Sequence, residues 1–294
     1  MIPPRVLIVA GSDSGGGAGL QADIKTCEAN GAFACNAVTA VTAQNTRGVH
    51  GIVGIDAEFV VAQMDAVLGD IGADAIKTGM LATTAVIRAV ATRARSASAA
   101  VVVDPVMVAA GGDVLIDADA IDAVRHELLP LATIATPNRR EAAVLLGAAD
   151  PPRTLAELRA AAADVHGRFR PHSVLVKGGD LADATALTNA VRLDRGPPLV
   201  VDVFYDGTVF AEFVSSKLDT RNTHGTGCTL ASAIAARLAA GDPLLDAVKA
   251  AKTYLDAALR ASACVHLGDG GYGPFVHAPA FWSARERVET SAGT

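Results

Sequence analysis

A turn of small residues near the end of the chain carries the strongest chemical signal. Residues 222–229 read Asn-Thr-His-Gly-Thr-Gly-Cys-Thr, and an Ala- and Leu-rich run follows directly. Gly225, Thr226 and Gly227 stand where a helix should begin, so several backbone N–H groups can point at one spot. The helix dipole favours a phosphate or a developing negative charge there. Cys228 lies in the same turn, and we expect this field to lower the pKa of its thiol and favour the thiolate.

Polar residues also follow several short apolar runs elsewhere in the chain. A glycine-rich segment, residues 11–19, follows the first run, and Asp104 ends a run of valines. Asn138 and Glu141 open an apolar helix pattern, and Lys177 precedes two glycines. A carboxylate can bind Mg²⁺, and a lysine is a point charge for a phosphate. Because ligands of open α/β sheets bind at the carboxyl ends of the strands, we expect these groups to converge on one sheet edge.

Each of these residues also has a simpler interpretation, which the sequence leaves open. Asp104 can be a turn or cap residue, and Lys177 a surface lysine beside a turn. Asn138 and Glu141 have the spacing of a capping box, in which each residue satisfies the other's backbone N–H. Cys228 can be a buried small hydrophobe, since free cysteine is often that.

Three other kinds of site fit the sequence less well. A Walker A loop is absent, because no Gly-Lys-Ser/Thr follows a glycine at the required spacing. A dinucleotide site would need an acidic residue at the end of the second strand, where residues 39–46 carry none. A cysteine hydrolase with His224 as its base is disfavoured, because His224 precedes the glycine turn. We expect His224 to be exposed or to cap a helix.

Composition bounds the class of protein. The chain has 294 residues, of which 51% are hydrophobic and 4% aromatic, so small aliphatic side chains must fill the core. The net charge of −6 and the lack of a basic run argue against nucleic acid or an anionic membrane as partner. We expect a cytoplasmic protein, since the chain shows no signal peptide and no apolar run of about 20 residues. Its cysteines lack zinc spacing, and we expect reduced thiols at Cys27, Cys35, Cys228 and Cys264.

Alternating short and long apolar segments predict an α/β fold with a largely parallel sheet covered on both faces. We expect strands at residues 6–10, 34–41, 75–77, 100–104, 133–135 and 173–176. We expect helices at residues 20–30, 57–68, 83–95, 118–128, 139–146, 155–168, 226–240 and 243–261. Residues 199–205 and 208–214, joined by Asp206-Gly207, predict an antiparallel hairpin. We expect a single domain over residues 1–282 and a frayed polar tail at 283–294.

Five segments, in their order along the chain, resemble the hydroxymethylpyrimidine/phosphomethylpyrimidine kinases of thiamine biosynthesis, which belong to the ribokinase-like superfamily. These segments are residues 11–23, 42–46, 76–81, 103–106 and 224–229. The resemblance covers roughly residues 6–272. It implies a three-layer α/β/α sandwich whose mostly parallel sheet has an antiparallel hairpin towards one edge. It also implies phosphorylation of 4-amino-5-hydroxymethyl-2-methylpyrimidine and then of its monophosphate, with ATP and Mg²⁺. By family analogy, we expect a homodimer.

The resemblance assigns roles residue by residue. Around the pyrimidine it places Gln44, Asp23, Gly11, Met80 and Met107, the last where a smaller apolar residue is expected. Near the phosphates of ATP it places Lys177, Asp104 and Asn138, and near Mg²⁺ it places Glu141 and Asp104. The anion hole is Gly225, Thr226, Gly227 and Cys228. Gln44 suits its role because an amide both donates and accepts.

The resemblance also implies which residue accepts the proton of the substrate hydroxyl. Much of the superfamily has an aspartate base where this subgroup, like this chain, has cysteine. Because a thiol is far more acidic than an alcohol, we expect Cys228 to accept the hydroxyl proton late in the transfer. Residues 183–222 match poorly, which leaves the adenine contacts open. A pyridoxal or pyridoxine kinase and a non-catalytic pyrimidine-binding protein are the alternatives.

Overall fold

The computed structural model describes residues 2–107, 118–179, 199–263, 265–280 and 282. Its central sheet has the strand order β10-β9-β8-β7-β6-β5-β1-β2. The strands are β1 (Arg5–Ala10), β2 (Phe33–Val38), β5 (Ala75–Thr78), β6 (Ala100–Val103), β7 (Ile134–Ala135), β8 (Val174–Val176), β9 (Leu199–Tyr205) and β10 (Phe210–Ser216). Neighbouring strands from β2 through β1, β5, β6 and β7 to β8 pair in parallel. The strand β9 pairs antiparallel with β8 and forms the expected antiparallel hairpin with β10 at one edge.

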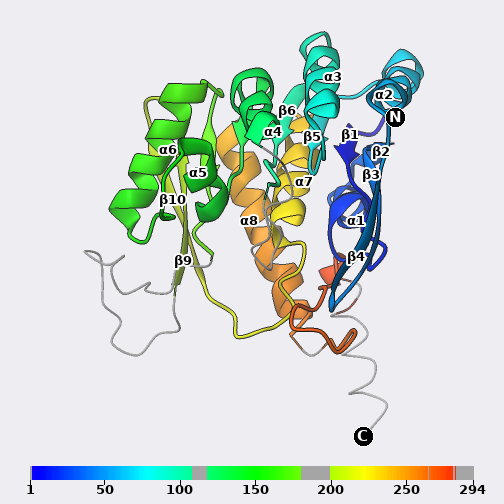
Figure 1. Ribbon diagram of the computed structural model, residues 1–294. Helices are drawn as coiled ribbons and strands as arrows, with labels where there is room; N and C mark the ends of the chain where they lie inside the picture. The colour runs from blue at the N-terminus through cyan, green and yellow to red at the C-terminus, as the bar shows by residue number, and fades with distance from the viewer. Residues whose placement is uncertain (1, 108–117, 180–198, 264, 281, 283–294) are drawn as a thin grey trace, which may run out of the picture.

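Helices cover both faces of this sheet, which gives the expected three-layer sandwich (Figure 1). One face packs against α1 (Gly19–Ala29), α7 (Thr226–Ala239) and α8 (Leu244–Ala261). The other packs against α2 (Ala57–Asp70), α3 (Thr84–Arg95), α4 (Ala118–Ala123), α5 (Arg139–Leu146) and α6 (Leu155–Phe169). Among the described helices, none is long and apolar enough to cross a membrane.

The alternation of side chains along β1 explains how one strand serves both cores. Leu7 and Val9 lie in the cluster under α2 and α3, whereas Val6, Ile8 and Ala10 lie in the cluster under α1 and α7. All five are at most 1% exposed, so the strand is apolar on both faces. Its carboxyl end therefore emerges between two helical layers, directly at the glycine-rich segment.

A second sheet corrects the prediction of one strand over residues 34–41. The first strand ends at Val38, and β3 (Ala40–Asn45) pairs antiparallel with β4 (Gly48–Gly54) in a separate two-stranded sheet. Thr39 marks the change of direction, because its N–H donates to Ala10 and its hydroxyl to the Met80 carbonyl, 2.6 Å away. Every residue of β4 is exposed, so its sequence lacks the buried apolar pattern that indicated the other strands.

The helix predicted over residues 118–128 is also only partly correct. After α4 the chain continues as a π-helical turn, Val124–Leu128, and then a 3₁₀ turn, Leu129–Leu131. Pro130 lies in this last turn and has no N–H with which to extend an α-helix. The predicted tail, Cys264 and residues 183–198 of the poorly matching segment lie outside the described residues. Cys27, Cys35 and Cys228 are free thiols, as expected.

Candidate active site

The turn before α7 has the geometry of an anion site. Gly225 is the N-cap, with φ of 93° and ψ of 4°, and a Cβ there would overlap the carbonyl oxygen of Gly17. Only glycine fits this close approach and this left-handed conformation. The turn therefore packs directly on the glycine-rich segment. The Thr226 N–H donates to the Thr223 carbonyl, and helix geometry leaves the N–H groups of Gly227 and Cys228 without a partner within α7.

Two of the predicted phosphate-binding residues reach this turn. Lys177 Nζ lies 2.9 Å from Asp104 Oδ1. A Cβ added to Gly227 would lie 3.1 Å from Lys177 Nζ and 3.7 Å from Asp104 Oδ2. Burial would lower the pKa of Lys177, but the charges of Asp104 and Glu141 outweigh it and raise the pKa. A charged ammonium, a carboxylate and a helix N-terminus thus meet at one point.

Asn138 and Glu141 form a complete capping box at the start of α5. The Asn138 N–H donates to Glu141 Oε2 at 2.7 Å, and the Glu141 N–H donates to Asn138 Oδ1 at 2.9 Å. The capping interpretation is therefore confirmed. It also serves the site, because Asn138 pairs with Lys177 in a parallel bridge and so brings α5 to the phosphate-binding lysine.

The carboxylates near this point fit a magnesium ion that keeps much of its water. Asp104 and Glu141 offer hard oxygen atoms and are 2% and 3% exposed. Within the part of the chain that is described, no three His, Cys, Asp or Glu residues gather as a closed metal cage. Mg²⁺ is typically bound by one or two carboxylates together with water and substrate phosphates. The donor set at this site fits that pattern.

The prediction of a lowered pKa for Cys228 is wrong. Cys228 is partly exposed as a residue, but the surroundings of its thiol bury the sulfur and raise its pKa to about 12. The charges of Asp23 and Asp104 act in the same direction. The ammonium of Lys77 and the backbone N–H of Gly19 lower the pKa without offsetting burial. The thiol is therefore neutral at physiological pH.

A buried ion pair lies beneath Cys228. Lys77 Nζ is 2.7 Å from Asp23 Oδ2, and both side chains are 0% exposed. The Ser232 hydroxyl donates to the other oxygen of Asp23, also at 2.7 Å. Ser232 follows Cys228 by one turn of α7, so both lie on the same face of the helix. Asp23 therefore lies under the site, and not on the pocket wall where we expected it.

Lys77 is a site residue to which the sequence had assigned no role. Its signal is a lysine at the end of an apolar strand, next to Gly79, whose added Cβ would lie 3.1 Å from Lys77 Nζ. Met107 also differs from the expectation of a pocket residue, because it is 0% exposed and packs in the core under α3.

Gly11, Met80 and Gln44 lie close to the glycine-rich segment. A Cβ on Gly11 would be 2.6 Å from Met80 Cε, so a larger residue would displace the partly buried Met80. Gln44 lies at a bulge in β3, where Ser14 holds its backbone. The Ser14 hydroxyl donates to the Gln44 carbonyl at 2.8 Å and lies 2.7 Å from the Gln44 N–H, from which it accepts.

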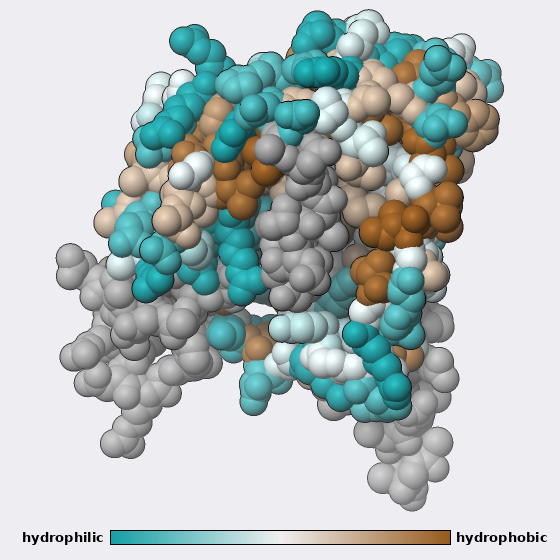
Figure 2. Space-filling view, viewed as in Figure 1, coloured by the Kyte–Doolittle hydropathy of each residue, from teal (hydrophilic) through white to brown (hydrophobic). Residues whose placement is uncertain are grey.

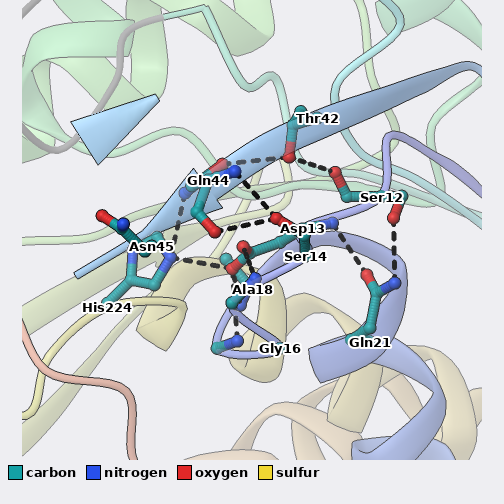
Figure 3. Close-up of polar contacts among 12 residues, drawn as sticks. Ser12, Asp13, Ser14, Gly16, Ala18, Gln21, Thr42, Gln44, Asn45 and His224 are labelled. Carbon is teal, nitrogen blue, oxygen red and sulfur yellow. Dashed lines mark hydrogen bonds and ion pairs between the residues drawn. The ribbon is translucent and has the colours of Figure 1, made fainter. Parts of the chain in front are cut away.

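His224 is neither exposed nor a helix cap, contrary to our expectation. Its side chain is 19% exposed, and Nε2 lies 2.9 Å from Asp13 Oδ2. The Gln44 amide points at the same ring nitrogen (Figure 3). The position of His224 directly before the glycine turn is the signal that could have revealed it. His224 thus connects Gln44, the residue predicted to bind the pyrimidine, to the turn that forms the anion site.

Comparisons with known proteins identify the family. A family model described as phosphomethylpyrimidine kinase matches residues 13–275. A hydroxymethylpyrimidine/phosphomethylpyrimidine kinase of Rhizobium meliloti is 46% identical over 94% of this chain and 97% of its own length. The chain belongs to the phosphomethylpyrimidine kinase family. A probable thiamine biosynthetic bifunctional enzyme of Oryza sativa is also 46% identical, over 93% of this chain. This phosphomethylpyrimidine kinase family member spans about half, 47%, of that relative.

Solved structures show the same ribokinase-like fold in kinases with two different substrate names. An ADP complex of Bacillus subtilis pyridoxal kinase has a TM-score of 0.83 and 34% identity, covering 95% of this chain and 99% of that one. A phosphomethylpyrimidine kinase of Clostridium difficile has a TM-score of 0.73 and 32% identity, covering 87% and 99%. The shared fold therefore does not by itself choose between the two alcohols.

Proposed function

We propose that this phosphomethylpyrimidine kinase family member transfers the γ-phosphoryl group of ATP to the hydroxymethyl group of 4-amino-5-hydroxymethyl-2-methylpyrimidine, and then to the monophosphate. The observation that carries this proposal is the approach of Lys177 and Asp104 to Gly227 at the start of α7. The name of the R. meliloti relative supports the acceptor, and the ADP complex of the B. subtilis kinase supports the nucleotide.

The anion site stabilises the transferring group. Phosphoryl transfer depends mainly on positioning and on stabilising charge that spreads over the γ-oxygens. The N–H groups of Gly227 and Cys228 and the ammonium of Lys177 supply fixed positive charge there. Capping by Asn138 and Glu141 holds the start of α5 beside them. These groups need no rearrangement as the charge develops.

Asp104 and Glu141 are the residues that would hold Mg²⁺, with Asn138 beside them. Mg²⁺ held there would supply positive charge that offsets the negative charge of the phosphate groups. Asp104 accepts from Lys177 at 2.9 Å and from Thr136 at 3.3 Å through Oδ1, while Oδ2 faces Gly227. One carboxylate thus orients the lysine with one oxygen and faces the phosphate site with the other.

Cys228 is the proposed base for the hydroxyl proton, in a narrower role than the sequence suggested. A neutral thiol cannot take a proton, and the raised pKa of Cys228 leaves only a small fraction of thiolate at pH 7. The ammonium of Lys77 stabilises this small fraction. General-base help contributes only about 10²–10⁴-fold in enzymes, so the anion site supplies more of the rate.

A comparison of acceptors tests the proposal. We expect kcat/KM with ATP and Mg²⁺ to be higher for the pyrimidine alcohol than for pyridoxine. A preference for pyridoxine would identify a pyridoxal kinase. Binding of the pyrimidine without consumption of ATP would identify a non-catalytic binding protein.

We further propose a cytoplasmic homodimer that associates through β3 and β4. Exposed apolar side chains lie on these strands, with Val41 48%, Ile52 50% and Val53 67% exposed. Figure 2 shows apolar side chains gathered on this side of the molecule. Sedimentation velocity tests the proposal. We expect the wild-type chain to sediment as a dimer and Val53→Lys to dissociate more readily into monomers.

A further inference from the structure

A chain of polar contacts runs from the glycine-rich segment through His224 to the amide of Gln44 (Figure 3). Asp13 is 3% exposed and begins this chain. Its carboxylate accepts backbone N–H groups of Gly15 at 2.8 Å, Gly17 at 3.2 Å and Ala18 at 2.8 Å. A carboxylate held by several donors remains ionised.

The ionised state of Asp13 fixes the hydrogen on the histidine ring. Burial would raise the pKa of Asp13, but the hydrogen bonds from His224, Ala18 and Gly15 outweigh it and lower the pKa. An ionised carboxylate only accepts, so His224 Nε2, 2.9 Å away, must donate. The tautomer of His224 follows from its partner.

This hydrogen in turn determines the orientation of the Gln44 amide. The amide nitrogen lies 3.2 Å from His224 Nε2, which would set two donors against each other. Rotating the amide by 180° about its terminal bond places Oε1 there as a second acceptor, which shares the single Nε2 hydrogen with Asp13 in a three-centre hydrogen bond. The amide nitrogen then takes the place of Oε1, which before the rotation lies 3.4 Å from the Thr42 hydroxyl. That hydroxyl donates to the Ser12 carbonyl at 2.8 Å, so it is free to accept.

We propose that His224 is a positioning residue that fixes which end of the Gln44 amide faces the substrate ring. The inference rests on the proposed function. Ser14 already holds the backbone of Gln44 from two sides, so rotation of the amide is the freedom that His224 removes.

The fixed amide has a defined chemical preference. His224 occupies one lone pair of Oε1, and Thr42 occupies one N–H, which leaves one acceptor and one donor for the ligand. A 4-aminopyrimidine offers a ring nitrogen that accepts next to an amino group that donates. A 4-oxopyrimidine offers the reverse order and would require the rotated amide. His224 therefore selects the 4-amino ring.

The turnover experiment compares kcat/KM for the 4-amino alcohol and its 4-oxo analogue in wild type, His224→Leu and His224→Gln. We expect the ratio of kcat/KM for the 4-amino alcohol to that for the 4-oxo analogue to fall at least about 10-fold in His224→Leu. In this variant a rotated Gln44 amide no longer loses a hydrogen bond to His224. His224→Gln keeps a donor and should retain part of the ratio. KM for ATP should be unchanged. His126→Leu, an exposed histidine against Phe169, is the control.

An unchanged ratio in His224→Leu, with both alcohols still turned over, would overturn the inference. A second measurement does not depend on turnover. Long-range ¹H–¹⁵N spectra of the wild-type imidazoles at pH 9 should show His224 protonated on Nε2, and protonation on Nδ1 would overturn it. If wild type does not phosphorylate the 4-amino alcohol while His224 carries its hydrogen on Nε2, the proposed function fails and the hydrogen-bond network stands.

Discussion

At the scale of single residues, Cys228 shows burial competing with a helix N-terminus. The field at a helix end is typically worth about 0.3–1 kcal/mol, which is less than one pKa unit. Burial instead raises the pKa of Cys228 from 9.0 to about 12. Burial therefore wins, and the motif that predicted a thiolate correctly located the residue but not its charge.

Replacing Cys228 by alanine tests its role as a base. We expect kcat to fall by about 10²–10⁴-fold with little change in pyrimidine affinity, because only the proton acceptor is lost. Since the thiolate fraction rises tenfold per pH unit below the pKa, wild-type kcat should rise between pH 7 and 10. The Cys228→Ala profile should lack this rise. Equal turnover in the two proteins would remove Cys228 from the mechanism.

At the scale of elements, the site depends on the junction of α1, β5 and α7. Asp23 comes from α1, Lys77 from β5 and Ser232 from α7, and the three side chains join in one solvent-inaccessible network. A buried pair is weak evidence for stability, but removal of one partner leaves an uncompensated charge. The network is therefore best understood as holding the three elements, and with them Cys228, in register.

Changing this pair separates stability from activity. Lys77→Met should lower the free energy of unfolding by about 3–5 kcal/mol, because Asp23 stays buried without its cation. The double variant Asp23→Leu/Lys77→Met should recover most of that loss in urea denaturation. It should nevertheless remain impaired in turnover, because Cys228 no longer has the ammonium beside it. Full activity of the double variant would show that the pair has no part in catalysis.

The start of α7 depends on a second feature, the close approach of Gly225 to Gly17. Gly225→Ala should abolish most phosphoryl transfer, because its Cβ would overlap the Gly17 carbonyl and displace the turn. Gly241→Ala is a matched control, since Gly241 has φ of 90° and open space around its Cα. The control has the same backbone strain without the overlap. Similar loss of kcat in both variants would show that the approach of Gly225 to Gly17 is not required for turnover.

Much of this arrangement could be predicted from the sequence, for a geometric reason. Lys177 and Asp104 follow strands that turned out parallel, so their ends had to meet at one edge. The Asp23–Lys77 pair could not be predicted, because it depends on two segments 54 residues apart packing in one register. The hairpin of β3 and β4 was missed because its exposed, glycine-containing strand lacks the apolar alternation on which strand prediction depends.

At the scale of the whole molecule, the segment around Phe275 and His277 packs against α7. His277 is 5% exposed, stacks on Phe275, and its Nε2 lies 3.1 Å from the Thr229 hydroxyl. Burial, with a smaller effect from Lys25, lowers the pKa of His277 to about 4. The closing segment therefore holds a histidine that is neutral while the protein is folded.

This histidine should make stability depend on pH. The unfolded chain binds a proton at His277 below pH 6.5, whereas the folded protein does so only near pH 4. The contribution of neutral His277 to the free energy of unfolding is therefore fully present above pH 6.5. It is lost as the pH drops towards 4, by up to roughly 3 kcal/mol. Urea denaturation should show a smaller fall in His277→Gln than in wild type, and an unchanged fall in His126→Gln. Identical pH dependence in wild type and His277→Gln would contradict this assignment.

We propose that the groups converging on Gly227 transfer phosphate to a pyrimidine alcohol. The most direct measurement is ³¹P NMR of the wild-type protein with ATP, Mg²⁺ and 4-amino-5-hydroxymethyl-2-methylpyrimidine. We expect a phosphomonoester signal that appears together with ADP, followed by the signals of a diphosphate ester. Unchanged ATP, or ADP and inorganic phosphate without any phosphate ester, would contradict it.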